Sequence, residues 1–282
     1  MARELTQVQW IEKSITSTYR KQLWAPFLTA INQYQLIQPH DHIAVCISGG
    51  KDSMLMAKLL QMLQRYSDIP MELTFLVMDP GYNKVNRQKI EENAKLLEIP
   101  IQIFETRIFD VANQETKKPC YLCARMRRGH LYAKAQELGC NKIALGHHLN
   151  DAIETTLMSM FYSSKLETMV PKCHSENFEG MELIRPMYGI KENDILKWCA
   201  YNRLTFIQCA CRFTENLALE TKETMSKRKE MKLLIQELKK TNPEIEENMF
   251  RALHRVQLST FPGYKADGKY HDINEDYNKK KQ

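Results

Sequence analysis

Six consecutive residues near position 50 have the types and the order of a phosphate-binding turn. They are Ser48, Gly49, Gly50, Lys51, Asp52 and Ser53. The apolar residues 43–47 before them predict a buried strand, and residues 54–63 after them predict a helix. Amides at a helix N-terminus are unpaired and the helix dipole adds about half a positive charge there, so a phosphate is the natural ligand. Val45 stands where the P-loop of kinases and GTPases has its first glycine, so this turn is of another type.

A pair of cysteines followed by arginines is the second group with recognisable chemistry. Cys120 and Cys123 are spaced so that their thiolates can bind one metal ion or the edge of a cluster. Arg125, Arg127 and Arg128 follow directly and form a dense site for an anionic ligand. The spacing alone is a weak signal, because a redox pair or two incidental cysteines would look the same.

Polar residues follow two of the predicted strands. Met78 and Asp79 end the strand predicted for residues 71–78, and His147 and His148 follow the one predicted for 142–145. In open α/β sheets ligands lie beyond the carboxyl ends of parallel strands, so Met78 and Asp79 are candidates to flank an adenosine. Adjacent histidines point in different directions, so we interpret this pair as a helix cap or a phosphate contact and not as metal ligands.

The elements that position these groups alternate between strands and helices. Strands are predicted for residues 43–47, 71–78, 99–104 and 142–145, and helices for 54–63, 85–97, 129–138 and 152–162. This alternation predicts an α/β fold with a doubly wound parallel sheet. A short strand and turn at 183–187 and a short strand at 204–208 are expected to follow.

Helical additions are expected on both sides of a central domain. The predicted division is an N-terminal helical segment 1–40, a domain 41–212 that carries the phosphate turn and the cysteines, C-terminal helices in 213–260, and a disordered tail 261–282 without apolar periodicity. The basic residues Lys227, Arg228, Lys229 and Lys232 lie on the first of the C-terminal helices. These side chains either form a solvated face of the helix or contact the phosphate backbone of an RNA.

The overall composition is compatible with an RNA ligand but does not demand one. The chain has 282 residues with 40 basic and 34 acidic side chains, a net charge of +6. It has neither an apolar run long enough to span a membrane nor the apolar core of a signal peptide. We therefore expect a cytoplasmic protein without membrane contact, in which the eight cysteines serve metal binding or catalysis more than disulfides.

The six-residue turn resembles the SGGxDS signature of the PP-loop, or N-type, ATP pyrophosphatases, which have an adenine nucleotide alpha hydrolase-like fold. Four further motifs are similar to the tRNA 2-thiocytidine synthetase family: Pro119-Cys120-x-x-Cys123-x-Arg125-x-Arg127-Arg128-Gly129, Leu145-Gly146-His147-His148-x-x-Asp151, Met160-Phe161-Tyr162-x-x-Lys165 and Pro171-Lys172. The similarity runs from about residue 41 to about residue 257, and it implies that the strand near residue 183 closes the sheet. Departures are Ser163 and Ser164 in place of two glycines, and Asn150 in place of a second acidic residue.

The resemblance implies a substrate, cofactors and roles for individual residues. It implies ATP with Mg²⁺, a 4Fe-4S cluster, and thiolation of the cytidine at tRNA position 32, with a cysteine desulfurase or free sulfide as sulfur donor and a homodimer as assembly. ATP would be bound by Ser48, Gly49, Gly50, Lys51, Asp52, Ser53, Met78, Asp79, Gly146 and His147. Catalysis would involve Lys51, Asp52, Asp151 and Arg127 (or its neighbour Arg128), and the cluster would be held by Cys120, Cys123 and Cys211.

Several alternatives stay open from the residues alone. The family has Cys-x-x-Cys where this chain has Cys209-Ala-Cys211, so Cys209 is an alternative third ligand. A uridine thiolase, or an amine-using PP-loop enzyme such as a lysidine synthetase, would share the phosphate turn. A non-catalytic RNA-binding module would instead hold zinc with Cys120, Cys123, Cys209 and Cys211. The remaining cysteines, Cys46, Cys140, Cys173 and Cys199, we interpret as packing or neutral positions.

Overall fold

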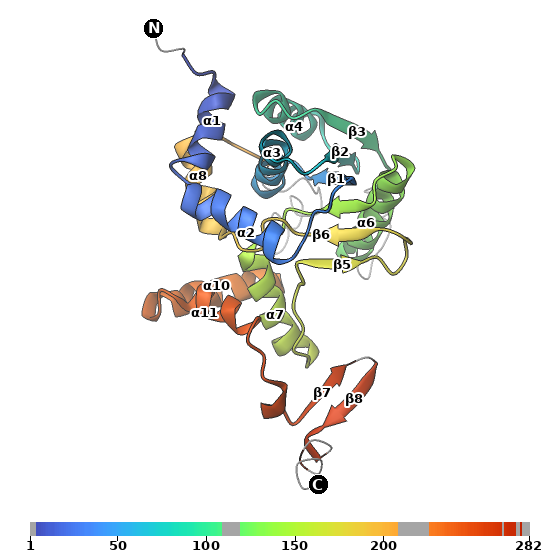
Figure 1. Cartoon of the computed structure of the whole chain (residues 1–282), viewed down its shortest axis with the longest axis vertical. Helices are drawn as coiled ribbons and strands as arrows, with labels where there is room; N and C mark the ends of the chain where they lie inside the picture. Colours follow the sequence, from blue (N-terminus) through green and yellow to red (C-terminus); the bar gives the residue numbers. More distant parts are fainter. Residues whose placement is uncertain (1–3, 109–118, 208–225, 267, 275–276, 278–282) are drawn as a thin grey trace. The chain divides into compact units, whose positions relative to one another are not determined.

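The computed structural model describes residues 4–108, 119–207, 226–266, 268–274 and 277 (Figure 1). The chain divides into two compact units, residues 1–229 and 230–282. The boundary expected at residue 212 lies outside the described residues. Within the described part of the chain, no helix is both long and apolar enough to cross a lipid bilayer.

The first unit is built on a six-stranded sheet with the order β3-β2-β1-β4-β6-β5. Its strands are β1 (Asp41–Ile47), β2 (Met71–Asp79), β3 (Ile101–Glu105), β4 (Lys142–Ala144), β5 (Lys172–His174) and β6 (Glu182–Ile184). Every neighbouring pair is parallel except β5 with β6. The predicted doubly wound sheet is therefore confirmed. The chain builds β2 and β3 on one side of β1 and β4 on the other, so the switch point for ligand binding lies at the carboxyl ends of β1 and β4.

Helices cover both faces of this sheet. In the first unit they are α1 (Gln7–Thr16), the π-helix η1 (Arg20–Trp24), α2 (Ala25–Gln33), α3 (Lys51–Tyr66), α4 (Lys84–Leu96), α6 (Pro119–Glu137), α7 (Leu149–Ser163) and α8 (Glu192–Tyr201), and α10 (Lys227–Thr241) begins there. Successive residues of a strand point to opposite faces. Ile43, Val45 and Ile47 accordingly join the core with α1–α3 and α8, whereas Ala44 and Cys46 join the core under α6. Figure 1 shows α6 on the side of the sheet opposite α1, α2 and α8.

Two expectations about the last strands were wrong. The strand near residue 183 does not close the sheet, because β5 pairs beyond it as an antiparallel edge strand. Residues 172–174 are all exposed and carry no apolar pattern, which explains why the sequence did not predict them. Residues 204–207 of the predicted strand 204–208 are irregular, and residue 208 lies outside the described residues. The side-chain amide of Asn93 donates to the Thr205 carbonyl (3.0 Å), so a side chain and not a neighbouring strand satisfies this carbonyl.

The second unit contains the rest of α10, helix α11 (Ile245–Ala252), the short 3₁₀-helix η2 (Leu258–Thr260) and a hairpin. The hairpin pairs β7 (Gly263–Ala266) with β8 (Lys269–Asp272), within the segment for which we expected disorder. Gly268 has φ 73°, and an Asp-Gly pair is a strong hairpin signal that the absence of apolar periodicity had hidden.

Candidate active site

The residues 48–53 form a closed turn between β1 and α3. Gly49 has φ 85°, a conformation that favours glycine, and a Cβ atom there would lie 2.5 Å from Cγ1 of Ile90. The Ser53 hydroxyl accepts from the Ser48 amide (3.1 Å) and donates to the Gly50 carbonyl (3.0 Å), which ties the turn together. Gly50 is the N-cap of α3 and provides no side-chain cap. The first amides of α3 are thus left for a ligand, as a phosphate cradle requires.

Lys51 is held between two carboxylates at this turn. Its Nζ atom lies 3.1 Å from Oδ2 of Asp52 and 3.1 Å from Oε1 of Glu192, the first residue of α8. Burial lowers the pKa of Lys51, but the two carboxylates raise it by more, so the pKa lies above its ordinary value. Oδ1 of Asp52 is buried and has no hydrogen-bond partner among the described residues. A cation and an unpaired carboxylate oxygen side by side fit a nucleotide phosphate with its metal ion.

Glu192 was not predicted as a site residue. Asn150 accepts from the Glu192 amide (2.9 Å) through its side-chain oxygen, and so fixes the start of α8 beside the turn. Asn150 is the position where this chain departs from the acidic residue of the family it resembles. No local sequence signal connects Glu192 with Lys51, because 141 residues separate them.

Gly146 brings the loop after β4 onto the first turn of α3. A Cβ atom at Gly146 would lie 3.0 Å from the Ser53 amide nitrogen and 3.1 Å from the Asp52 carbonyl carbon. The next residue, His147, has a buried Nδ1 atom without a hydrogen-bond partner in the described part of the chain. Burial lowers the pKa of His147 to about 4, and Arg185 and Arg228 add to this effect while Asp151 opposes it. His147 is therefore neutral at physiological pH.

His148 is the N-cap of α7 and forms a capping box with Asp151, which confirms the helix-cap interpretation for His148 but not for His147. Oδ2 of Asp151 accepts from the His148 amide (3.0 Å), and Nδ1 of His148 accepts from the Asp151 amide (3.4 Å). Nε2 of His148 lies 3.8 Å from Oδ1 of Asp52, so the cap of α7 faces the phosphate turn. The structure thereby brings Asp52 and Asp151 to the same end of the sheet.

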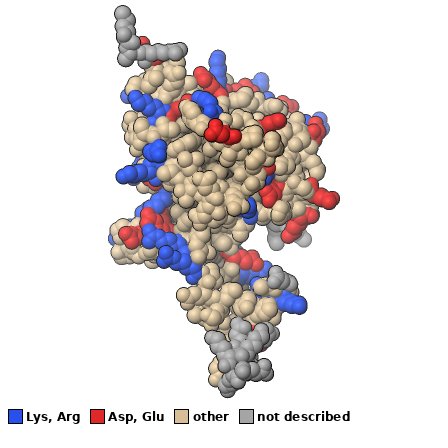
Figure 2. Space-filling view, in the orientation of Figure 1, with Lys and Arg blue, Asp and Glu red and all other residues tan. Residues whose placement is uncertain are grey.

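Arg228 of α10 contacts three side chains of α7. Its Nη1 atom lies 2.8 Å from Oδ1 of Asp151 and 3.3 Å from Oε2 of Glu154, and Nη2 donates to the Thr155 hydroxyl (3.2 Å). We expected the basic residues of this helix to be solvated or to meet RNA phosphates, but Arg228 is committed to these partners. Lys227 and Lys229 on the same helix are exposed. Figure 2 shows basic side chains gathered in the region of α10 and α11.

The candidates to flank an adenosine lie on the opposite side of the turn, at the end of β2. Met78 is buried, and Oδ1 of Asp79 accepts from the amides of Gly81 (2.9 Å) and Tyr82 (2.7 Å). Oδ2 of Asp79 pairs with Nη1 of Arg87 at 2.6 Å. The Asp79 carboxylate thus stabilises the loop that follows β2. This loop contacts the phosphate turn through the Tyr82 hydroxyl, which donates to the Ser48 carbonyl (3.5 Å).

The predicted cluster ligands are only partly within the described chain. Cys120 and Cys123 fall within the first residues of α6, whereas Cys209 and Cys211 lie outside the described residues. Ile207, four residues before Cys211, packs against Gly49 of the phosphate turn. Arg127 is partly buried, and Arg125 and Arg128 are exposed on α6.

The remaining cysteines do not suit a cluster. Burial raises the pKa of Cys46 to about 12 and that of Cys199 to about 11, and it also raises the pKa of Cys140. Thiolates are the metal-binding form, so these three are packing residues as expected, and Cys173 is exposed on edge strand β5. Within the described ranges, no three Cys, His, Asp or Glu side chains converge on a metal position. Cys120, Cys123 and either Cys209 or Cys211 therefore stay the predicted cluster ligands.

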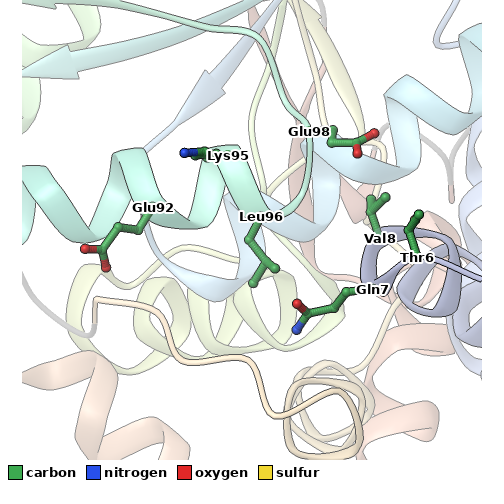
Figure 3. Close-up of a pocket in the computed structure, with 7 residues that line it drawn as sticks. All are labelled: Thr6, Gln7, Val8, Glu92, Lys95, Leu96 and Glu98. Carbon is green, nitrogen blue, oxygen red and sulfur yellow. The ribbon is translucent and has the colours of Figure 1, made fainter.

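A hollow on the surface of the first unit lies elsewhere. It measures about 450 Å³ and is lined by the start of α1 and the C-terminal end of α4 (Figure 3). Glu92, Lys95 and Glu98 supply its charges, and none of the predicted site residues lines it. We assign no ligand to this hollow.

Comparisons with known proteins agree with this geometry. Residues 20–214 match a family of PP-loop domains. The chain is 35% identical over 232 residues to a tRNA-cytidine(32) 2-sulfurtransferase from Geobacter sulfurreducens, covering 81% of this chain and 87% of the relative. It is 36% identical over 251 residues to the enzyme of that name from Paraburkholderia phytofirmans, covering 85% and 72%. Among solved structures, the U34-tRNA thiolase NcsA from Methanococcus maripaludis with its 4Fe-4S cluster has the same fold, with a TM-score of 0.64, 19% identity and coverage of 83% and 79%.

Proposed function

Because this chain belongs to the tRNA-cytidine(32) 2-sulfurtransferase family of PP-loop proteins, we propose that it uses ATP to replace the C2 oxygen of a tRNA cytidine with sulfur. The observation that carries the proposal is the closed turn at residues 48–53, which stands at the switch point of the sheet with Lys51 and Asp52 at the start of α3. Its open amides and its cation suit the pyrophosphate of ATP.

The first step activates the base. The C2 oxygen attacks the α-phosphorus of ATP, pyrophosphate leaves, and the oxygen is now carried by AMP. Lys51 and the first amides of α3 stabilise the negative charge that moves onto the pyrophosphate. To do so, Lys51 exchanges its present carboxylate partners for phosphate, and the Asp52 oxygen that lacks a partner in the described residues is suited to hold Mg²⁺.

The second step delivers sulfur. Hydrosulfide attacks C2, AMP leaves with the former carbonyl oxygen, and a proton is released, so the exchange of oxygen for sulfur involves no net oxidation. A 4Fe-4S cluster on Cys120, Cys123 and Cys211 would supply an iron without a protein ligand, to which sulfide can bind. Asp151, fastened by its capping box and by Arg228, would orient the base, and Arg127 would stabilise charge on the adenylated oxygen. The sulfur donor, a cysteine desulfurase or free sulfide, and the homodimer stay predictions.

The decisive experiment combines product analysis with nucleoside analysis. Deleting the gene should remove 2-thiocytidine from bulk tRNA, as measured by mass spectrometry of digested nucleosides. The wild-type chain should restore it and Lys51→Ala should not, while anaerobic turnover should release AMP and pyrophosphate. Unchanged 2-thiocytidine with loss of a thiouridine would assign this protein to uridine instead, and release of ADP and phosphate alone would contradict the adenylation step.

The cluster is tested separately by colour and metal content. Protein purified without oxygen should be brown and contain iron and sulfide, and Ser in place of Cys120 or Cys123 should bleach it. If Cys209→Ser bleaches the protein and Cys211→Ser does not, the third ligand is Cys209. A colourless protein loaded with zinc would support the zinc-stapled module.

A further inference from the structure

Three buried side-chain polar atoms lack a hydrogen-bond partner within the described residues, and all three follow strands at the same edge of the sheet. They are Oδ1 of Asp52, Nδ1 of His147 and Nε of Arg185. Asp52 follows β1, His147 follows β4, and Arg185 is the first residue after β6. An unsatisfied buried polar atom is costly, so a row of them at a ligand-binding edge points to groups that a ligand satisfies. The predicted ATP site uses Asp52 and His147, and leaves Arg185 unexplained.

Arg185 carries a desolvated charge without a counter-ion. Its Nη1 atom donates to the Val170 carbonyl and the Cys173 thiol lies near its guanidinium, but it makes no ion pair with a carboxylate among the described residues. Burial lowers the pKa of Arg185. By contrast, Arg65 pairs with both oxygens of Glu12 (3.0 and 3.2 Å). A partly buried charge without a counter-ion is costly to the fold, and a ligand of opposite charge at this position would offset that cost.

A second cation lies next to this one. Burial raises the pKa of Tyr132 on α6, and the nearby guanidinium groups of Arg128 and Arg185 oppose that rise. Arg128 is exposed and belongs to the arginine group that follows Cys120 and Cys123 in α6. Arg128 lies one helical turn before Tyr132 on α6, and Arg185 is the first residue after β6. A planar guanidinium binds phosphate oxygens in pairs, so the exposed Arg128 and the partly buried Arg185 suit one anion.

Topology separates this pair from the ATP phosphates. The strand order β2-β1-β4-β6 places the end of β6 two strands from the phosphate turn, on the side away from the predicted adenosine at β2. Two strand spacings are about 10 Å. An ATP molecule that runs from the end of β2 past the turn to His147 after β4 leaves the end of β6 for the second substrate.

We propose that Arg185 and Arg128 form a second anion subsite, which binds a backbone phosphate of the RNA substrate beside the ATP site. The inference rests on the proposed tRNA substrate. The ligand would be a phosphate group with one negative charge from the RNA backbone. The alternative is that the phosphate group belongs to ATP. A phosphate held here would fix the nucleotide chain next to the site at which a base is activated.

The test compares Arg185→Gln with Arg65→Gln, an arginine that is ion-paired and lies outside the site. Arg185→Gln should weaken tRNA binding by about 10-fold or more, as expected for loss of a charge-assisted hydrogen bond, and should reduce the dependence of log affinity on log salt by about one. Its melting temperature should fall by less than that of Arg65→Gln, because it loses a hydrogen bond to the Val170 carbonyl but no ion pair. Arg65→Gln should do the reverse, with a lower melting temperature and unchanged tRNA binding. Arg185→Lys should restore the salt dependence but only part of the affinity.

The opposite results would overturn the inference. A raised KM for ATP with unchanged tRNA affinity would assign the anion to ATP, and a fall in melting temperature with unchanged tRNA affinity would make Arg185 a structural residue. These outcomes are distinct from failure of the proposed function. If Arg185→Gln loses tRNA affinity but the enzyme produces a thiouridine, the subsite stands and the cytidine assignment falls.

Discussion

Replacing Gly49 by alanine tests whether the phosphate turn depends on the absence of a side chain. The added Cβ would lie 2.5 Å from Cγ1 of Ile90 and 2.7 Å from Cδ1 of Ile207. The Ile207 atom is the end of a flexible side chain and can move. Ile90 is fully buried and branched at Cβ, so the contact with its Cγ1 decides the cost.

Two effects contribute to the expected loss of stability. A left-handed conformation costs a residue with a Cβ roughly 1–2 kcal/mol. Overpacking against a fixed core adds roughly 1–3 kcal/mol. Gly49→Ala should therefore lose roughly 2–5 kcal/mol of unfolding free energy. Gly180 is the matched control, because it has φ 74° and no atom within 4 Å of an added Cβ, so Gly180→Ala should show only the first effect.

Urea unfolding followed by circular dichroism gives both free energies, and a third variant isolates the clash. Ile90→Ala removes the atom that the new Cβ would meet, so combining it with Gly49→Ala should cost less than the sum of the two single changes. Equal losses for Gly49→Ala and Gly180→Ala, together with additivity in the double variant, would refute the close approach of Ile90 to the turn.

Three further results are expected. Arg228→Gln should lower the rate of AMP formation by about 10-fold with little change in KM for ATP, because Asp151 loses its charged partner (2.8 Å). The neighbouring control Lys229→Gln should leave this rate unchanged. Equal effects of the two substitutions would mean that only net charge matters. Because the pKa of His147 is lowered to about 4, the unfolded chain binds a proton that the native protein does not, so the urea midpoint should fall as the pH drops from about 6.5 to about 4. His147→Gln should flatten this fall, and an identical pH dependence in both proteins would contradict the assignment. In the native protein at pH 8, iodoacetamide should modify Cys173 and leave Cys46 unmodified, as peptide mass spectrometry would report.

The sequence by itself determined the features that depend on neighbours along the chain. The strand, turn and helix around Ser48–Ser53 could be predicted because glycine conformation, helix-terminal amides and apolar patterning are local properties. The cap formed by His148 and Asp151 was predictable for the same reason, since three residues separate the two. The alternation of strands and helices then restricted the sheet to a parallel one.

Only the tertiary structure decided which distant groups complete the site. Glu192 reaches Lys51 across 141 residues, and Arg228 reaches Asp151 across 77. Neither pairing leaves a pattern in the sequence. A charged residue on a solvated helix face and one that pairs with a distant side chain have the same sequence surroundings. The edge strand β5 was not predicted because its residues are exposed and show no apolar pattern. It is a strand only through its backbone pairing with β6. Arg185 was predicted to lie in a strand and turn, like any polar residue at a strand end. Only the folded chain shows that its Nε atom is buried at the end of β6 without a hydrogen-bond partner among the described residues.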